Sequence, residues 1–155
     1  MSLKLGNLRV ESPSFQHLGR MPKRHAGDAD NLSPPLEWSG APAGTREFAV
    51  LCFDPDAPRL DGVTHWVLYG IPSNVTSLPE GEGADAYTGG VNITGKPGYL
   101  GPRPPPGHGA HHYYFWVFAL DGELGLKPGL DRPQLMDAIK GHVLEQARLV
   151  GIYER

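Results

Sequence analysis

Two aspartates stand where an apolar segment of the chain ends. Phe48–Phe53 is continuously apolar, which is typical of a strand buried on both faces, and it stops at Asp54-Pro55-Asp56-Ala57-Pro58. Sites are commonly built at strand ends and in the loops beyond them. A carboxylate there could take part in acid–base chemistry or ligate a metal ion.

Histidines open two further strand-like segments. Thr64–Ile71 and His111–Leu120 are both rich in β-branched and aromatic residues. The histidines at or just before their starts are His65, His108, His111 and His112. On an extended strand His111 and His112 point to opposite faces, whereas Tyr113 shares the face of His111. We therefore expect only one of the two adjacent histidines, together with Tyr113, to line a given site.

Three kinds of chemistry compete for these residues. A metal site would use His111 and Asp54, but the opposed His112 cannot join it, and neither a cysteine pair nor His-Glu-x-x-His is present. A weak acid–base hydrolase would use Asp54 with His65 or His111, but the chain has no nucleophile elbow, phosphate loop or cofactor fingerprint. An anion pocket would use imidazole and tyrosine hydroxyl donors.

Some histidines are instead expected in the core, with their rings hydrogen-bonded to the backbone. This is the interpretation that we prefer for His17, His25, His112 and His142. The single cysteine, Cys52, lies inside an apolar run and is expected to be an inert core residue. One cysteine excludes an internal disulfide and favours a reducing compartment, and with no signal peptide recognised at the N-terminus we expect a cytoplasmic protein.

Turns dominate the segments that must position these groups. Gly and Pro supply 21 and 16 of 155 residues, and no apolar stretch is long enough to span a membrane as a helix. An edge strand is expected within Leu3–Val10, and a last strand at Leu149–Tyr153.

The net charge of −3 and the lack of a basic stripe argue against a nucleic-acid partner. We expect residues 1–155 to form a single domain of short strands.

One helix is predicted near the C-terminus. Asp131 has the residue type of an N-cap, Pro133 suits the first turn, and Gln134 completes the spacing of a capping box. Apolar residues then recur every four positions, which extends the predicted helix to Ala147. They are Leu135, Ile139, Val143 and Ala147.

Three separated motifs resemble the phosphatidylethanolamine-binding protein family, specifically its bacterial and archaeal Raf-kinase-inhibitor-like branch. They are Asp54-Pro55-Asp56-Ala57-Pro58, His65-Trp66-Val67 and Gly101-Pro102-x-Pro-Pro-Pro-Gly-His-Gly-x-His111-x-Tyr113. Ser33–Trp38 also matches that branch, so that the resemblance spans about residues 10–153. It departs at His112, where the family usually has Arg, and at Arg103, where a small residue is usual.

The resemblance implies a mainly β fold, in which a large central antiparallel sheet packs on a smaller sheet and a C-terminal helix lies near a small anion pocket. The pocket residues that it implies are Asp54, His65, His111 and Tyr113, with Ala57, Pro58, Pro104 and Pro105 as walls. We add Arg103, whose guanidinium could reach the pocket mouth.

The function expected on these grounds is binding of a phosphate- or carboxylate-bearing small molecule or lipid headgroup. The resemblance implies no metal and no cofactor, and we expect no enzyme activity. Bacterial relatives of this kind are often homodimers, so a homodimer is expected. The alternative is a regulator that binds another protein, since eukaryotic members of the family inhibit protein kinases.

Overall fold

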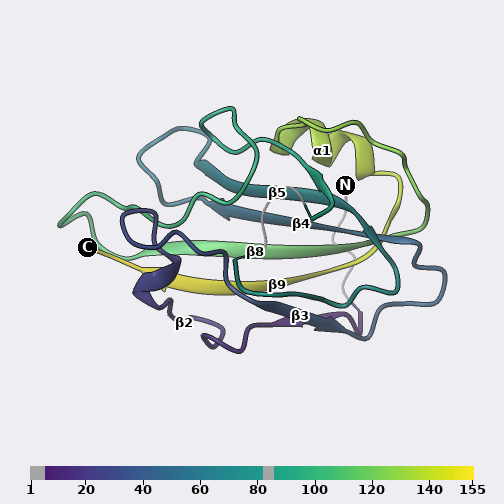
Figure 1. Ribbon diagram of the computed structural model, residues 1–155, viewed down its shortest axis with the longest axis horizontal. Helices are drawn as coiled ribbons and strands as arrows, with labels where there is room; N and C mark the ends of the chain where they lie inside the picture. Colours follow the sequence, from purple (N-terminus) through teal and green to yellow (C-terminus); the bar gives the residue numbers. More distant parts are fainter. Residues whose placement is uncertain (1–5, 82–85) are drawn as a thin grey trace.

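The chain folds into two β-sheets and one α-helix in the computed structural model, which describes residues 6–81 and 86–155 (Figure 1). The larger sheet has the strand order β2-β9-β8-β4-β5-β7, and the smaller has the order β1-β3-β6. The strands of the larger sheet are β2 (Gly19–Arg20), β4 (Glu47–Asp54), β5 (Val63–Pro72), β7 (Thr88–Gly89), β8 (His111–Leu120) and β9 (Val143–Tyr153). The other elements are β1 (Arg9–Glu11), β3 (Leu36–Ser39), β6 (Ser77–Leu78), the 3₁₀ turn η1 (Lys23–His25) and α1 (Arg132–Ile139). The mainly β class with two sheets and a helix near the C-terminus is confirmed.

Antiparallel pairing of the long strands places the candidate site residues at one end of the larger sheet. β4 runs antiparallel to both β5 and β8, and β9 runs antiparallel to β8. The end of β4 therefore meets the starts of β5 and β8. All three long strands that the sequence predicted are present, each extended by no more than two residues.

The larger sheet is apolar on both faces. One face packs against the smaller sheet through a core that includes Trp38, Val50 and Phe115. The other face packs against α1 through a second core that includes Leu51 and Leu135. The near-continuous burial of β4 follows from this sandwiched position, and the continuous apolar run Phe48–Phe53 predicted it.

The helix is shorter than the four-residue spacing predicted. Its capping box is as expected, since Gln134 N donates to Asp131 Oδ1 over 2.9 Å and Asp131 N donates to Gln134 Oε1 over 3.0 Å. It ends at Ile139, however, and Val143 and Ala147 belong to β9. They lie in different cores, Val143 with α1 and Ala147 between the sheets. Pairing with β8 along the whole of β9 outweighs the weak local helix preference around Gly141.

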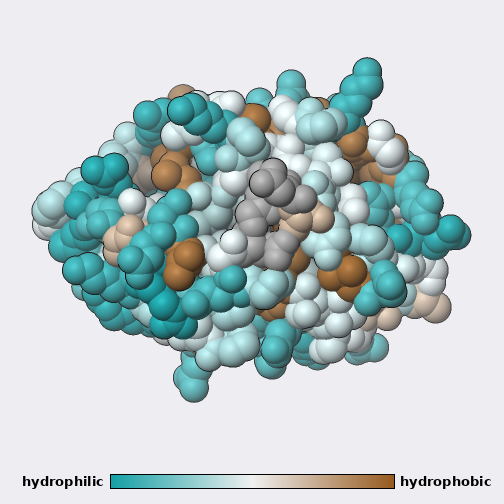
Figure 2. Space-filling view, viewed as in Figure 1, coloured by the Kyte–Doolittle hydropathy of each residue, from teal (hydrophilic) through white to brown (hydrophobic). Residues whose placement is uncertain are grey.

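The N-terminal strand β1 begins at Arg9 and extends one residue beyond the predicted segment Leu3–Val10, of which residues 3–5 lie outside the described residues. The face of the molecule in Figure 2 is mainly hydrophilic or neutral, with hydrophobic residues showing as separate spots. The exposed large apolar residues of the described chain are Leu18, Leu60 and Ile93. They are far apart in sequence, and single exposed residues of this kind are normal for a protein surface.

Candidate functional site

A cavity of about 230 Å³ lies where β4 ends and β5 and β8 begin. The structure brings to it every site residue that the sequence predicted, and adds Val63. The lining residues are Asp54, Ala57, Pro58, Val63, His65, Arg103, Pro104, Pro105, His111 and Tyr113.

Asp54 holds the His111 imidazole. Its Oδ2 atom accepts a hydrogen bond from His111 Nδ1 over 2.8 Å, and both side chains are buried. Its Oδ1 atom accepts from Asp56 N over 2.8 Å, which shapes the turn after β4. The carboxylate thus fixes the orientation of the imidazole and leaves Nε2 as the outer ring nitrogen of His111.

His108 lies on the outer side of His111. Its Nδ1 atom is 2.6 Å from His111 Nε2, and the two rings meet edge to face at 4.9 Å. His108 is exposed, whereas the His111 side chain that it contacts is buried. The sequence placed His108 just before the start of a strand, which pointed to the site, although His108 was not among the predicted site residues.

A β-bulge turns His65 toward the cavity. Cys52 pairs with Trp66 and Phe53 pairs with Thr64, so that His65 has no partner on β4. Its Nδ1 atom lies 2.5 Å from Leu100 O, and because a carbonyl only accepts, Nδ1 carries the hydrogen. Burial lowers the pKa of His65, against the opposing effects of Leu100 O and Asp54. The neutral ring therefore has an unprotonated Nε2.

Tyr113 supplies a hydroxyl to the same cavity. Its ring meets that of His65 edge to face at 5.1 Å and lies nearly parallel to that of His111 at 6.5 Å. Burial and the nearby Asp54 raise the pKa of Tyr113, so its hydroxyl keeps its proton. Among the described residues the hydroxyl has no hydrogen-bond partner, and it is available to donate to a ligand.

His112 faces away from the cavity, as strand alternation predicts. Its backbone N and its Nδ1 atom both lie within 2.8 Å of Asp56 Oδ2. Burial acts to raise the pKa of Asp56, but these contacts with His112 outweigh it and lower the pKa. The side chain of His112 is 39% exposed, so the expected core position is wrong. The pair ties the Asp54–Pro58 turn to the start of β8.

The Pro-rich loop forms the outer wall and is anchored at several points. Leu100 N donates to His65 O, Gly27 N donates to Pro102 O, and Arg155 Nε donates to Pro104 O. Arg103 lies between these anchors, is exposed, and still borders the cavity. Arg103 thus brings a cationic residue to the border of the cavity.

The remaining histidines and the cysteine lie elsewhere. His25 is buried with Nδ1 2.8 Å from Leu32 O, as expected for a core histidine. His17 and His142 are exposed, which corrects their predicted core positions, although His17 Nδ1 accepts from Val150 N. Cys52 is buried, and burial raises the pKa of its thiol well above the ordinary value, as befits an inert core residue.

The described residues hold neither a group of side chains suited to a metal ion nor a membrane-spanning helix. Within 6–81 and 86–155, no three or more His, Cys, Asp and Glu side chains are grouped so as to hold a metal ion. In the same part of the chain, no helix has the length and apolar character needed to cross a membrane.

Comparisons with known proteins agree on one family. The sequence profile described as "Phosphatidylethanolamine-binding protein" matches residues 11–154. A UPF0098 protein of Methanothermobacter thermautotrophicus is 40% identical over 153 residues, covering 96% of this chain and 99% of its own. LppC of Mycobacterium tuberculosis is 38% identical over 148 residues, which cover 95% of this chain and 72% of LppC. Its name gives it provisionally as a lipoprotein.

A solved structure extends the match to the fold. E. coli YbcL, whose structure is described as a new member of the mammalian family, superposes with a TM-score of 0.91 at 31% identity. The match covers 97% of this chain and 99% of YbcL. The chain belongs to the phosphatidylethanolamine-binding protein family.

Proposed function

We propose that the cavity between Asp54, His65, His111 and Tyr113 binds a phosphate or carboxylate group, such as that of a phosphoethanolamine headgroup. The observation that carries this proposal is the convergence of two oriented imidazoles, one free hydroxyl and the exposed Arg103 on a single small cavity. Hydrogen bonds to an ionised oxygen are stronger than neutral ones, so the Tyr113 hydroxyl and Arg103 can hold the anion, and His65 joins them once a proton is present on its ring or on the phosphate.

The size of the cavity favours a headgroup over a whole lipid. Its volume of about 230 Å³ lies below the roughly 300–1,000 Å³ that is usual for drug-sized ligands. Its walls are rigid, because Pro58, Pro104 and Pro105 fix the backbone around it. A preorganised wall of this kind lowers the entropy lost on binding.

Binding without turnover is the activity proposed for this site. None of the lining residues is Ser, Thr or Cys, so the described cavity offers no hydroxyl or thiol nucleophile other than the Tyr113 phenol. Asp54 and His111 are hydrogen-bonded to each other, an arrangement that suits an acid–base pair. Hydrolysis of p-nitrophenyl phosphate that is abolished by His111→Ala would contradict a pure binding role.

Calorimetric titration with inorganic phosphate and with phosphoethanolamine tests the binding site. We expect Tyr113→Phe to weaken phosphate binding by about 1.5–3 kcal/mol, or roughly ten- to hundredfold, because the variant loses a hydrogen bond to a charged group. Tyr114→Phe is the matched control, since Tyr114 is the next residue of β8 and does not line the cavity. Equal phosphate affinity for Tyr113→Phe and the unaltered protein would overturn the proposal.

The proposal includes a cytoplasmic homodimer, which rests on family membership and on the single cysteine. Light scattering at tens of micromolar protein, on the order of protein concentrations used for binding work, should report twice the mass of the 16.8 kDa chain. A monomer at that concentration would contradict the dimer and leave the pocket proposal intact.

A further inference from the structure

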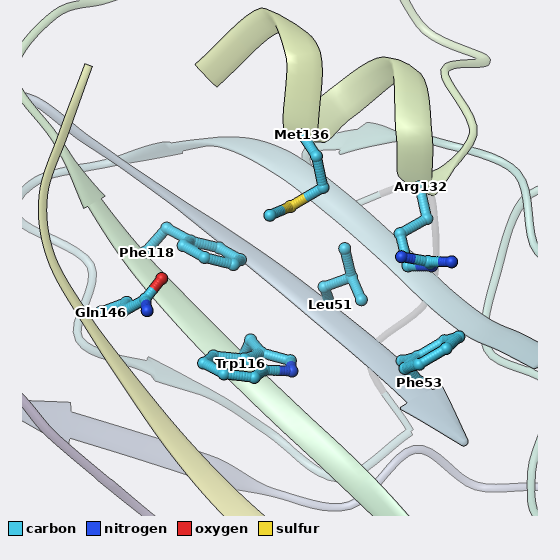
Figure 3. A pocket seen from close by; sticks show the side chains of 7 residues that line it. All are labelled: Leu51, Phe53, Trp116, Phe118, Arg132, Met136 and Gln146. Carbon is cyan, nitrogen blue, oxygen red and sulfur yellow. The ribbon is translucent and has the colours of Figure 1, made fainter. Parts of the chain in front are cut away.

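A second cavity, of about 310 Å³, lies between the larger sheet and α1 (Figure 3). Its walls are mainly apolar and come from β4, β8, β9 and α1. The lining residues are Leu51, Phe53, Trp116, Phe118, Arg132, Met136 and Gln146. By strand alternation these β4 and β8 residues face away from the first cavity, so the two cavities lie on opposite faces of the sheet.

The apolar part of this cavity is flat and aromatic. The Trp116 and Phe118 rings lie 6.0 Å apart with only 9° between their planes, and Phe53 adds a third ring. Phe53, Trp116 and Met136 are only half-buried, because α1 has eight residues and covers one part of the sheet face. Aromatic ligands pack well against such surfaces.

Gln146 places an unpartnered amide at one side of the cavity. The residue is 3% exposed, and no residue in the described ranges forms a hydrogen bond with its side chain. In Figure 3 the amide lies by Phe118 and Trp116, at the edge of the cavity. The amide is not among the fully buried unpartnered groups of the described residues, so it opens onto the cavity, where a polar atom of a ligand can reach it.

Arg132 places a cation at the other side. Its guanidinium lies 4.1 Å from the centre of the Phe53 ring, and Nε is 3.3 Å from Thr64 Oγ1. In the described part of the chain no carboxylate lies within ion-pair distance of it. Burial lowers the pKa of Arg132, although Asp61 and Asp131 act in the opposite direction. This half-buried cation is thus partly desolvated and suited to an anionic group.

We propose that this cavity binds a small aromatic carboxylate, with its ring between Trp116, Phe118 and Met136 and its carboxylate on Arg132. The Gln146 amide then hydrogen-bonds a second polar atom of the ligand. Charge complementarity with Arg132 selects an anion, and the flat aromatic walls select a ring. This site is separate from the proposed phosphate pocket and does not depend on it.

Calorimetric titration with 2-naphthoate tests the site, with 2-naphthalenemethanol as the uncharged probe of the same shape. We expect 2-naphthoate to bind the unaltered protein one to one, and Arg132→Gln to weaken it at least tenfold. The alcohol should bind weakly to both proteins. Arg148→Gln is the matched control, because Arg148 also lies over Trp116, at 5.6 Å, but does not line the cavity.

Gln146→Leu is a second, independent variant. It replaces the amide with an apolar side chain of similar size, so it should weaken 2-naphthoate severalfold by removing the hydrogen bond to the ligand. Circular dichroism verifies that each variant is folded. Unchanged 2-naphthoate affinity in Arg132→Gln, or in Gln146→Leu, overturns the assignment of that contact, and in both variants it overturns the site.

Two further outcomes would assign the groove to something else. Weaker 2-naphthoate binding in Tyr113→Phe would place the probe in the phosphate pocket and overturn this inference, while the proposed function would stand. A 2-naphthoate Kd that rises with protein concentration, together with a dimer in light scattering, would show that a second copy of the chain covers the groove.

Discussion

His65 and Trp66 are consecutive in the sequence, yet both side chains lie on the same face of the larger sheet. Trp66 belongs to the core between the sheets, and the His65 ring contacts Tyr113, which belongs to that core too. The bulge between the pairs Cys52–Trp66 and Phe53–Thr64 breaks the usual alternation at His65. Without the bulge, His65 would face α1 and the cavity would lose one of its two imidazoles.

The buried, neutral state of His65 predicts a pH-dependent stability. Its pKa in the folded protein is lower than in the unfolded chain, so the unfolded chain binds more protons as pH falls below about 6.5. Stability should therefore be full above pH 6.5 and decrease as pH falls through the folded pKa. His25 acts in the same direction, because burial lowers its pKa as well.

Urea unfolding at pH 8 and at pH 5 measures this effect. The unaltered protein should be less stable at pH 5, the difference should shrink in His65→Gln, and it should shrink further when His25→Gln is added. Asp56 does not interfere, since its lowered pKa places its effect below pH 4. An equal loss of stability in all three proteins would show that these two imidazoles are not its source.

Proton uptake on phosphoethanolamine binding is a second prediction. Because Nδ1 of His65 donates to Leu100 O, its Nε2 can hydrogen-bond a phosphate oxygen only if a proton is present on the ring or on the phosphate. A phosphomonoester has a second pKa of about 6. The affinity should accordingly rise as pH falls from 8 to 6. Titrations in buffers of different ionisation enthalpy count the protons, and zero net uptake would contradict this account of His65.

Arg103 carries a third prediction, because it is exposed and borders the cavity. Arg103→Ala should weaken phosphate binding by about 1 kcal/mol at low salt, and by less at moderate salt, since exposed charges are screened. Arg59→Ala is the control, as Arg59 is exposed on the neighbouring turn and does not line the cavity. If the two variants bind phosphate equally well at low salt, Arg103 is not part of the site.

The pairing of Asp54 with His111 could be predicted from the sequence, because each residue lies at the end of a segment with a strong strand pattern. Phe48–Phe53 and His111–Leu120 are apolar or β-prone over their whole length, so the ends of both strands were placed correctly. Adjacent antiparallel strands bring the end of one next to the start of the other, which places Asp54 beside His111. Prolines and glycines then mark the two loops that enclose the cavity.

Features that depend on contacts between distant segments could not be predicted from the sequence. The bulge at His65 has no marker in its own residues, because it arises from how β5 fits β4. Similarly, Val143 and Ala147 carry a helical spacing, and only pairing with β8 shows that they belong to a strand. Gln146 was hidden inside that mistaken helix, so the second cavity had no sequence signal.

A last prediction concerns Gly101, where the Pro-rich loop passes close to η1. A Cβ atom on residue 101 would collide with the carbonyl oxygen of His25 and would lie 2.8 Å from Gly27 N. These are backbone atoms, and hydrogen bonds from Gly101 N to Asn31 Oδ1 and from Gly27 N to Pro102 O keep the two segments together. Gly101→Ala must therefore push the loop outward, at a cost of about 1–3 kcal/mol for overpacking.

Displacement of this loop would reach the cavity, since Arg103 follows two residues later and borders it. Gly101→Ala should thus lower both the free energy of unfolding and the phosphate affinity. Gly141→Ala is the control, because a Cβ there has nothing within 4 Å and the residue has no positive φ, so its stability should stay equal or rise slightly. Urea unfolding and phosphate titration of both variants compare them. A Gly101→Ala protein as stable as Gly141→Ala would mean that the loop is free to move away from η1, and the cavity wall would then not be rigid.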